Sequence, residues 1–157
     1  MKIPFAKVSP LAKLPTRGTP GSAGLDLFAA VGYGVEVTLR PFERSLIPTG
    51  LQIQLPVGFE AQVRPRSGLA LRHGITVLNS PGTIDSDYVV NDKGQPCEIM
   101  VLLGYDGPNS RKIQPGDRIA QIVFASTNAA EFDEKTAEQW PSAAGRRAGG
   151  FGSTGSS

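Results

Sequence analysis

Hydrophobic and polar residues alternate with a period of two in several short segments of the chain. Apolar residues at 51, 53 and 55 alternate with two glutamines, and those at 59, 61 and 63 alternate with Glu, Gln and Arg. Val35, Val37 and Leu39 alternate with Glu36 and Thr38 in the same way. Because successive side chains of a strand point to opposite faces, each segment is predicted to be a strand with one buried face.

Three other segments are more continuously apolar: ITVLN from Ile75, EIMVLL from Glu98 and RIAQIVFA from Arg118. Such runs predict strands that are buried on both faces. The pairs Pro81-Gly82 and Gly116-Asp117 predict turns between them. Many short strands at this spacing predict an all-β protein, with a sandwich or barrel of jelly-roll-like form.

Only two segments have the length and composition of a helix. LALRHG, which follows residues 66–68, could form one or two turns, and residues 129–140 could form a short helix with a thin apolar face. After Trp140 the chain is rich in Gly and Ser and lacks the apolar residues needed to fold alone. We therefore expect a β domain over residues 1–140 with one short helix, and a flexible arm over residues 141–157.

The composition supports one globular β domain. The 157 residues are 39% hydrophobic and 19% charged, and 19 Gly with 13 Pro favour tight turns over a helical bundle. A net charge of +2 is too small to indicate binding to nucleic acid or an anionic membrane. There is no apolar run long enough to span a bilayer, no secretory signal is expected, and Cys97 has no cysteine partner. A cytoplasmic protein is expected.

Four common kinds of catalytic site are excluded by the sequence. The chain has no G-x-x-x-x-G-K-[ST] phosphate loop, and one Cys with one His cannot form a zinc site. A Ser-His-Asp relay would require His73, whose LRHG surroundings do not suggest a buried base. No helix carries the stacked carboxylates of a helical metal-dependent nucleotide hydrolase.

Three short polar segments remain as candidates. Arg66, Ser67 and Gly68 stand at a predicted strand-to-helix junction, where an arginine, a hydroxyl and free N–H groups could hold phosphate oxygens. The alternative is a turn in which Ser67 is the helix N-cap. Asp85 and Asp87 would share a face on a strand and could activate water or bind a hard cation. The alternative is a turn in which the Asp side chains cap the backbone.

The third candidate is GGFGSTG in the arm. Its glycines expose N–H groups, Ser153 and Thr154 add hydroxyls, and Phe151 could stack on a base, with Arg146 and Arg147 just upstream. These features suit a lid over a nucleoside triphosphate. A disordered tail is the alternative.

Five ordered motifs relate these segments to a known family. They are AGLDLFAA from Ala23, RPRSGLA from Arg64, NSPGTIDSDY from Asn79, PGDRIAQIVF from Pro115 and RRAGGFGSTG from Arg146. In content and order they resemble the homotrimeric dUTPase family, over almost the whole chain. The resemblance implies a jelly-roll-like β-sandwich in which three subunits share three active sites.

The resemblance also implies a reaction. The family hydrolyses dUTP to dUMP and pyrophosphate with Mg²⁺, which limits uracil in DNA and supplies dUMP for dTMP synthesis. The residue similar to the family's catalytic aspartate is Asp85, which would activate a water for in-line attack on the α-phosphorus. Asp26 would hold a water on a Mg²⁺ ion that is carried mainly by the triphosphate.

Substrate-binding residues follow from the same motifs. A hairpin that runs from Asn79 through Gly82, Thr83 and Ile84 to Tyr88 and beyond would bind uracil, with Tyr88 packed on the deoxyribose and Met100 as the hairpin residue that faces the base. The phosphates would contact Arg66, Ser67 and Gly68 of a neighbouring subunit, and Gln121. The arm would close over the substrate through Arg146, Phe151, Gly152, Ser153 and Thr154.

The chain departs from the family pattern in two places. The Asp-Tyr-Arg-Gly-Glu continuation of the third motif is replaced by the longer VVNDKGQPCE after Tyr88, and the pattern resumes near Glu98. This insertion could extend a hairpin tip, with a turn at residues 92–94, or could alter trimer contacts or the metal region. Arg147 stands where the family usually has Gly, and is expected to alter arm closure.

Two other functions remain open at this point. A dCTP deaminase shares the fold, although the intact GTIDSDY and GGFGSTG segments favour dUTP hydrolysis. A dUTPase-like regulatory protein that binds a partner is the second, and the insertion is the feature that could support it.

Overall fold

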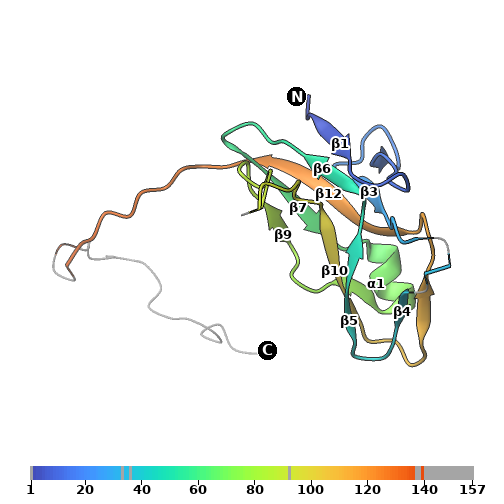
Figure 1. Ribbon diagram of the computed structural model, residues 1–157. Helices are drawn as coiled ribbons and strands as arrows, with labels where there is room; N and C mark the ends of the chain where they lie inside the picture. Colours follow the sequence, from blue (N-terminus) through green and yellow to red (C-terminus); the bar gives the residue numbers. More distant parts are fainter. Residues whose placement is uncertain (1, 33, 36, 92, 137–138, 140–157) are drawn as a thin grey trace, which may run out of the picture.

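The computed structural model describes residues 2–32, 34–35, 37–91, 93–136 and 139. The regular secondary structure in the described part of the chain consists of short strands and one helix (Figure 1). The strands are β1 (Phe5–Lys7), β2 (Thr16–Arg17), β3 (Leu25–Phe28), β4 (Val37–Leu39), β5 (Arg44–Pro48), β6 (Leu51–Ile53), β7 (Phe59–Arg64), β8 (Ile75–Val77), β9 (Gly82–Ile84), β10 (Met100–Tyr105), β11 (Arg111–Ile113) and β12 (Arg118–Ser126), and the helix is α1 (Ser67–His73).

The strands form two main antiparallel sheets and two small ones. The larger sheet has the order β2-β3-β12-β7-β9, and the second has the order β5-β10-β8. β1 pairs with β6, and β11 pairs with β4. Buried side chains from both main sheets belong to one hydrophobic core, among them Leu27, Ala61 and Ile122 from the first and Ile47 and Leu103 from the second. This arrangement confirms the predicted jelly-roll-like β fold.

The alternation along the sequence predicted the buried faces well, with two exceptions. Leu51 and Ile53 are buried in β6, as predicted. Val35, however, is 60% exposed and lies before the start of β4. β8 is buried on one face only, because Thr76 is exposed between two buried residues. The two errors have the same cause, since local pattern does not show where a strand begins or what covers its second face.

The helix predicted after residues 66–68 is present but already begins at Ser67, and the alternative in which Ser67 is the N-cap is wrong. The N-cap is Arg66, in extended backbone, so Ser67 is the first helical residue and makes no side-chain cap hydrogen bond. The helix ends at Gly74, whose φ of 63° is the left-handed conformation that glycine adopts without strain. The N–H of Gly74 donates to the carbonyl of Ala70. Helix α1 is therefore fixed at its C-terminal end rather than by a serine cap.

The second predicted helix is absent from residues 129–136, which are all exposed. A short helix with a thin apolar face gains too little from packing to offset its nucleation cost. This part of the chain leads away from the sheets beyond β12 (Figure 1). The proposed arm, residues 141–157, lies outside the described residues. Among those that are described, no helix combines the length and the apolar character needed to cross a membrane.

Candidate active site

A pocket of about 320 Å³ opens where β9 approaches β10. β9 pairs with β7, with Gly82 opposite Val63 and Ile84 opposite Ala61. The pocket is lined by Leu46, Val63, Asn79, Gly82, Thr83, Ile84, Tyr88, Ile99, Met100 and Leu102. The six residues that the sequence analysis assigned to uracil and deoxyribose are all in this lining, so the fold brings them together.

The pocket combines apolar walls with one amide side chain. A Cβ added at Gly82 would lie 3.1 Å from Nδ2 of Asn79, so the glycine leaves room for that amide beside the strand. Ile84 and Ile99 are buried and form part of the apolar wall. A small planar ligand with polar edges suits such a site, because apolar walls hold its faces while a fixed amide contacts an edge.

Tyr88 lies at the wall of the pocket and is 43% exposed. Its hydroxyl donates a hydrogen bond to the carbonyl oxygen of Glu98, at 3.2 Å. Burial raises the pKa of the Tyr88 phenol, and the nearby Cys97 and Glu98 raise it further. The phenol therefore remains protonated at neutral pH, and its hydroxyl remains a donor.

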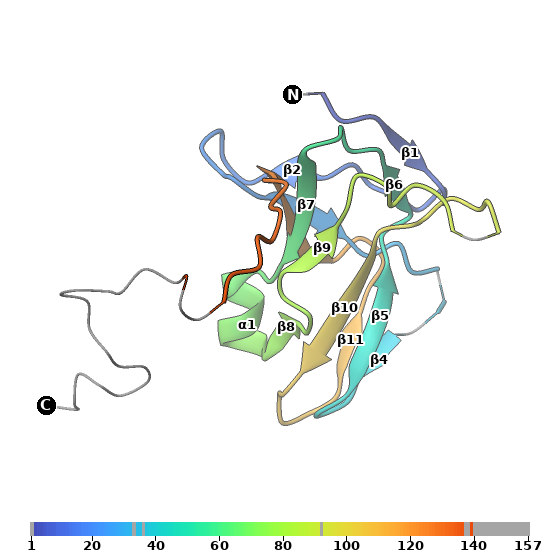
Figure 2. The same ribbon diagram turned by 90° about the vertical axis from the view of Figure 1, so that its left-hand side faces the viewer.

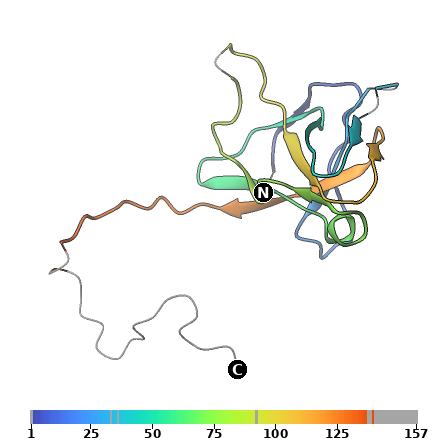
Figure 3. The same ribbon diagram turned by 90° about the horizontal axis from the view of Figure 1, so that it is seen from below.

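The inserted segment after Tyr88 folds into a narrow loop (Figure 3). Val90 and Pro96 form an isolated antiparallel bridge. Asn91 Oδ1 accepts the backbone N–H groups of Lys93 and Gln95, both at 3.0 Å. The predicted turn at this tip is confirmed at its described residues, Lys93 and Gly94, and Asp92 lies outside them. The hairpin was predicted to run from Asn79 through Ile84 to Tyr88 and beyond; in the structure β9 pairs with β7, residues 86–89 form a turn, and the chain folds back at the Val90–Pro96 bridge.

Asp85 follows directly after the end of β9 and is exposed. Asp87 lies in the turn that begins there, so of the two alternatives the structure shows a turn and not two carboxylates on one face of a strand. The turn is held by backbone bonds from Tyr88 N to Asp85 O and from Val89 N to Asp87 O. Because the strand ends at Ile84, the two aspartates occupy different environments, and Asp85 alone is placed at the strand end.

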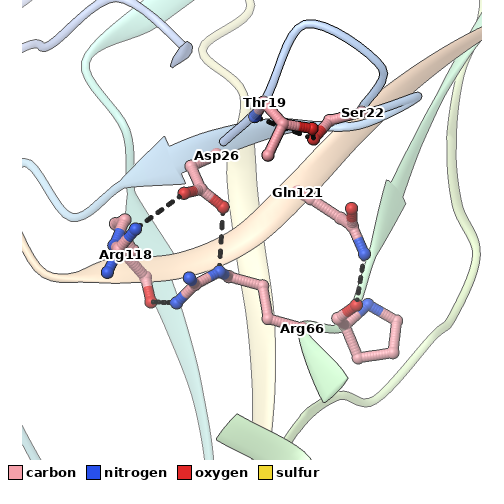
Figure 4. A network of polar contacts seen from close by, with 7 residues as sticks. Thr19, Ser22, Asp26, Arg66, Arg118 and Gln121 are labelled. Atoms are coloured by element: carbon pink, nitrogen blue, oxygen red, sulfur yellow. Dashed lines mark hydrogen bonds and ion pairs between the residues drawn. The ribbon is translucent and has the colours of Figure 1, made fainter. Parts of the chain in front are cut away.

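A second polar cluster surrounds Arg66 at the junction of β7 and α1 (Figure 4). Arg66 Nε lies 2.9 Å from Oδ1 of Asp26, and Nη1 of Arg118 lies 3.3 Å from Oδ2 of the same carboxylate. Arg66 Nη1 also donates to the carbonyl of Arg118, at 3.1 Å. Asp26 is only 14% exposed, so this carboxylate is a partly buried link between two arginines.

Gln121 belongs to the same cluster because of the register of β12. It stands opposite Asp26 of β3 on one side and opposite Arg64 of β7 on the other. Its Nε2 donates to the carbonyl of Pro65, at 2.9 Å. A Cβ at Gly24 would overlap the Gln121 side chain, so Gln121 can occupy this position only because residue 24 is glycine. The fold thus brings together predicted residues from the first, second and fourth motifs.

Two arginines at this cluster, Arg72 and Arg118, were not identified from the sequence. Arg118 pairs with Asp26, and Arg72 folds back over the first turn of α1, where a Cβ at Gly68 would lie 2.7 Å from its Nη2. The spacing from Gly68 to Arg72 is i to i+4 on a helix, a signal that could have identified the second arginine. Both residues add positive charge beside the segment predicted to hold phosphates.

The residues of the Arg66 cluster are suited to a Mg²⁺ ion only if the substrate supplies most of the ligands of the metal. Within the described ranges, no group of three or more His, Cys, Asp or Glu side chains could hold a metal ion. Both oxygens of Asp26 already face arginine nitrogens. Mg²⁺ is commonly bound by one or two carboxylates together with substrate phosphates and water, and such a donor set is compatible with this site.

Asp85 and the Arg66 cluster lie toward opposite ends of β7. Ile84, which precedes Asp85, pairs with Ala61 near the start of β7, whereas Arg66 follows its end. Six residues of strand span on the order of 20 Å. Figures 2 and 3 show α1 and the loop that follows β9 on opposite sides of the molecule. Asp85 and Arg66 of one chain are therefore too far apart to contact the same phosphate group.

The predicted arm residues Arg146, Phe151, Gly152, Ser153 and Thr154 lie outside the described residues, as do Arg147 and Trp140.

Comparison with known proteins connects these features to one family. The family model described as dUTPase matches residues 11–155. The deoxyuridine 5'-triphosphate nucleotidohydrolase of Bartonella quintana (strain Toulouse) is 54% identical over 149 residues, covering 91% of this chain and 77% of the relative. The enzyme of the same name from Rhizobium etli (strain CIAT 652) is 51% identical over 143 residues, covering 91% and 85%.

Solved structures with the same fold include phage dUTPases. A mutant dUTPase of Staphylococcus bacteriophage 80alpha, solved with dUpNHpp, superposes with a TM-score of 0.80 at 23% identity, covering 99% of both chains. A mutant dUTPase from phage phi11 of S. aureus, described for its structural Mg(II) ion, has a TM-score of 0.73 at 19% identity and covers 86% and 97%. At these identities the likeness is one of fold.

Proposed function

This chain belongs to the dUTPase family and is a dUTP diphosphatase, and we propose that it cleaves dUTP to dUMP and pyrophosphate with Asp85 activating the attacking water. The observation that carries the proposal is the pocket beside β9, where the six residues expected to bind uracil and deoxyribose line a single cavity. Asp85 directly follows this strand, one residue beyond Ile84 of the pocket lining.

The pocket supplies base and sugar recognition in this mechanism. Asn79 and the backbone of residues 82–84 contact the edge of uracil, and Met100 lies against the base. Such fixed donors and acceptors reject cytosine, because a mismatched edge would leave buried polar groups unpaired. Tyr88 packs on the deoxyribose and leaves no room for a 2′-hydroxyl. Binding in this orientation directs the α-phosphate towards Asp85.

The chemical step requires one oriented water. The Asp85 carboxylate accepts a hydrogen bond from this water and takes its proton as the oxygen attacks the α-phosphorus in line. The bond from the α-phosphorus to the bridging oxygen breaks, and pyrophosphate leaves. Arg66, Ser67, Gly68 and Gln121 hold the phosphates and offset the charge that develops there. A Mg²⁺ ion on the triphosphate oxygens would neutralise further charge, with Asp26 contacting one of its waters.

The distance between Asp85 and Arg66 within one chain supports an active site shared between subunits. A second copy would have to bring its own Arg66 cluster to the Asp85 of the first. We propose the homotrimer of the family as the assembly that does this, since a closed ring repeats the same contact three times. The arm residues Arg146, Phe151, Gly152, Ser153 and Thr154 are proposed to close over the bound nucleotide. A cytoplasmic location remains a prediction.

Asp85→Asn tests the proposal, with Asp87→Asn as the matched control two residues away. We expect Asp85→Asn to lower kcat for pyrophosphate release from dUTP by about a thousandfold, the contribution typical of a lost general base. Asp87→Asn should stay near wild type. The assay includes dCTP with detection of ammonia, which separates hydrolysis from deamination. Full activity of a folded Asp85→Asn protein, or deamination of dCTP by the wild type, would overturn the proposal.

A further inference from the structure

Glu98 connects the end of the inserted loop to two other parts of the molecule. The chain returns from the Val90–Pro96 bridge through Cys97 and Glu98 before β10 begins. Glu98 is partly buried, and its side chain and its backbone carbonyl each make a hydrogen bond. None of the roles derived above uses this residue.

The carboxylate of Glu98 holds the turn between β5 and β6. Its Oε1 accepts the backbone N–H of Gly50, at 2.5 Å. The neighbouring residues join the same two segments: Thr49 Oγ1 donates to the carbonyl of Ile99 at 2.6 Å, and Ile99 N donates to the carbonyl of Leu51 at 2.7 Å. Thr49 is fully buried, so these bonds are formed away from water and are costly to break. Glu98 is thus attached to a rigid part of the core.

The backbone of Glu98 holds Tyr88. The Tyr88 hydroxyl donates to its carbonyl oxygen, at 3.2 Å. The carbonyl of Val89 accepts from Cys97 N at 2.9 Å and from Nε2 of Gln52. Both ends of the inserted loop are therefore held at its base by hydrogen bonds.

We propose that Glu98 is a positioning residue for Tyr88, and that through Tyr88 it sets the preference for deoxyribose over ribose at this pocket. The inference rests on the proposed function, because it gives Tyr88 the sugar as its ligand. An aromatic ring excludes a 2′-hydroxyl only if it cannot move back to admit one. Tyr88 is 43% exposed, and the hydrogen bond from its hydroxyl to the Glu98 carbonyl anchors the outer end of the ring.

The proposal accounts for how the chain accommodates its insertion. Residues added between Val89 and Cys97 lengthen the loop beyond the points where Gln52 and Glu98 fasten it. Movement of the tip is then not transmitted to Tyr88. The insertion leaves the pocket wall in place because the anchoring contacts lie between the tip and the pocket.

Glu98→Ala tests this role, with Glu98→Gln as the conservative variant and Glu43→Ala as the matched control. Gln retains an oxygen that can accept from Gly50 N, whereas Ala does not. Glu43 also accepts a backbone N–H, that of Arg40 at 2.9 Å, in a turn that is not part of the pocket. The measurement is the ratio of kcat/KM for dUTP to that for UTP, with melting temperature recorded for each variant.

We expect Glu98→Ala to lower this ratio about tenfold, mainly through easier use of UTP, as the loss of a hydrogen bond to a charged group would predict. Glu98→Gln should restore most of the ratio, and Glu43→Ala should leave it unchanged even if it lowers stability. An unchanged ratio in folded Glu98→Ala, or an equal fall in Glu43→Ala, would overturn the inference. Failure of the wild type to hydrolyse dUTP would instead overturn the proposed function.

Discussion

The base pocket and the Arg66 cluster are built in different ways. Most of the residues that line the pocket come from one stretch of chain, residues 79–100. The apolar walls of the pocket are continuous with the hydrophobic core. The cluster joins residues far apart in sequence, Asp26, Arg66, Arg118 and Gln121, through ion pairs and hydrogen bonds. A pocket of the first kind is held by packing, and a cluster of the second kind is held by charge.

This difference matches what each region is proposed to bind. Uracil is flat and neutral, and it is recognised by shape and by a few fixed polar groups. A triphosphate is highly charged, so it needs several cations and N–H donors whose positions can adjust to it. Substitutions in the two regions should therefore have different effects. Those in the pocket should lower the selectivity for the base, and those in the cluster should lower the rate and the binding of all nucleotides.

The largest effect in this comparison is expected for Arg66→Ala. It removes a proposed phosphate ligand and leaves the partly buried Asp26 with one fewer cation. We expect kcat/KM for dUTP to fall about a hundredfold, with the preference for dUTP over dCTP unchanged. Steady-state kinetics with both nucleotides measure this. Arg64→Ala, two residues earlier on the exposed end of β7, is the control, and an equal loss in that variant would contradict the assignment.

A smaller and different effect is expected for Asn79→Ala. The substitution removes the amide beside Gly82, so the edge of the base loses a fixed partner. We expect kcat/KM for dUTP to fall about tenfold and the preference for dUTP over dCTP to fall with it. Competition between the two nucleotides measures the preference. Asn91→Ala, at the tip of the inserted loop, should change neither quantity, and an unaltered preference in Asn79→Ala would argue against base recognition there.

The two regions also differ in how far the sequence predicted them. The residues of the pocket could be identified because the third motif and its continuation resemble the dUTPase family, although the pairing of β9 with β7 was not foreseen. Strand pairing depends on contacts distant in sequence, which local alternation does not encode. In the cluster, the contribution of Arg118 was missed for the same reason, since only the register of β12 against β3 brings it to Asp26.

The exact residues at which β9 ends and α1 begins depend on local backbone conformation. The position of Asp87 in a turn follows from the end of β9 at Ile84, and the N-cap at Arg66 follows from extended backbone after β7. The turn was one of the two alternatives for Asp87 and the cap lies one residue before Ser67, and each of these ends decides which side chains face one another. The all-β class and α1 were predictable because alternation and turn residues agree over many segments.

The most direct test of the central claim is complementation between two inactive variants. Asp85→Asn and Arg66→Ala proteins are unfolded together, refolded as a mixture and assayed for dUTP hydrolysis, with each variant refolded alone as the control. If each site takes Asp85 from one subunit and the Arg66 cluster from another, random assembly leaves about a quarter of the sites intact, and activity returns to that extent. A mixture no more active than its two components would contradict a site shared between subunits.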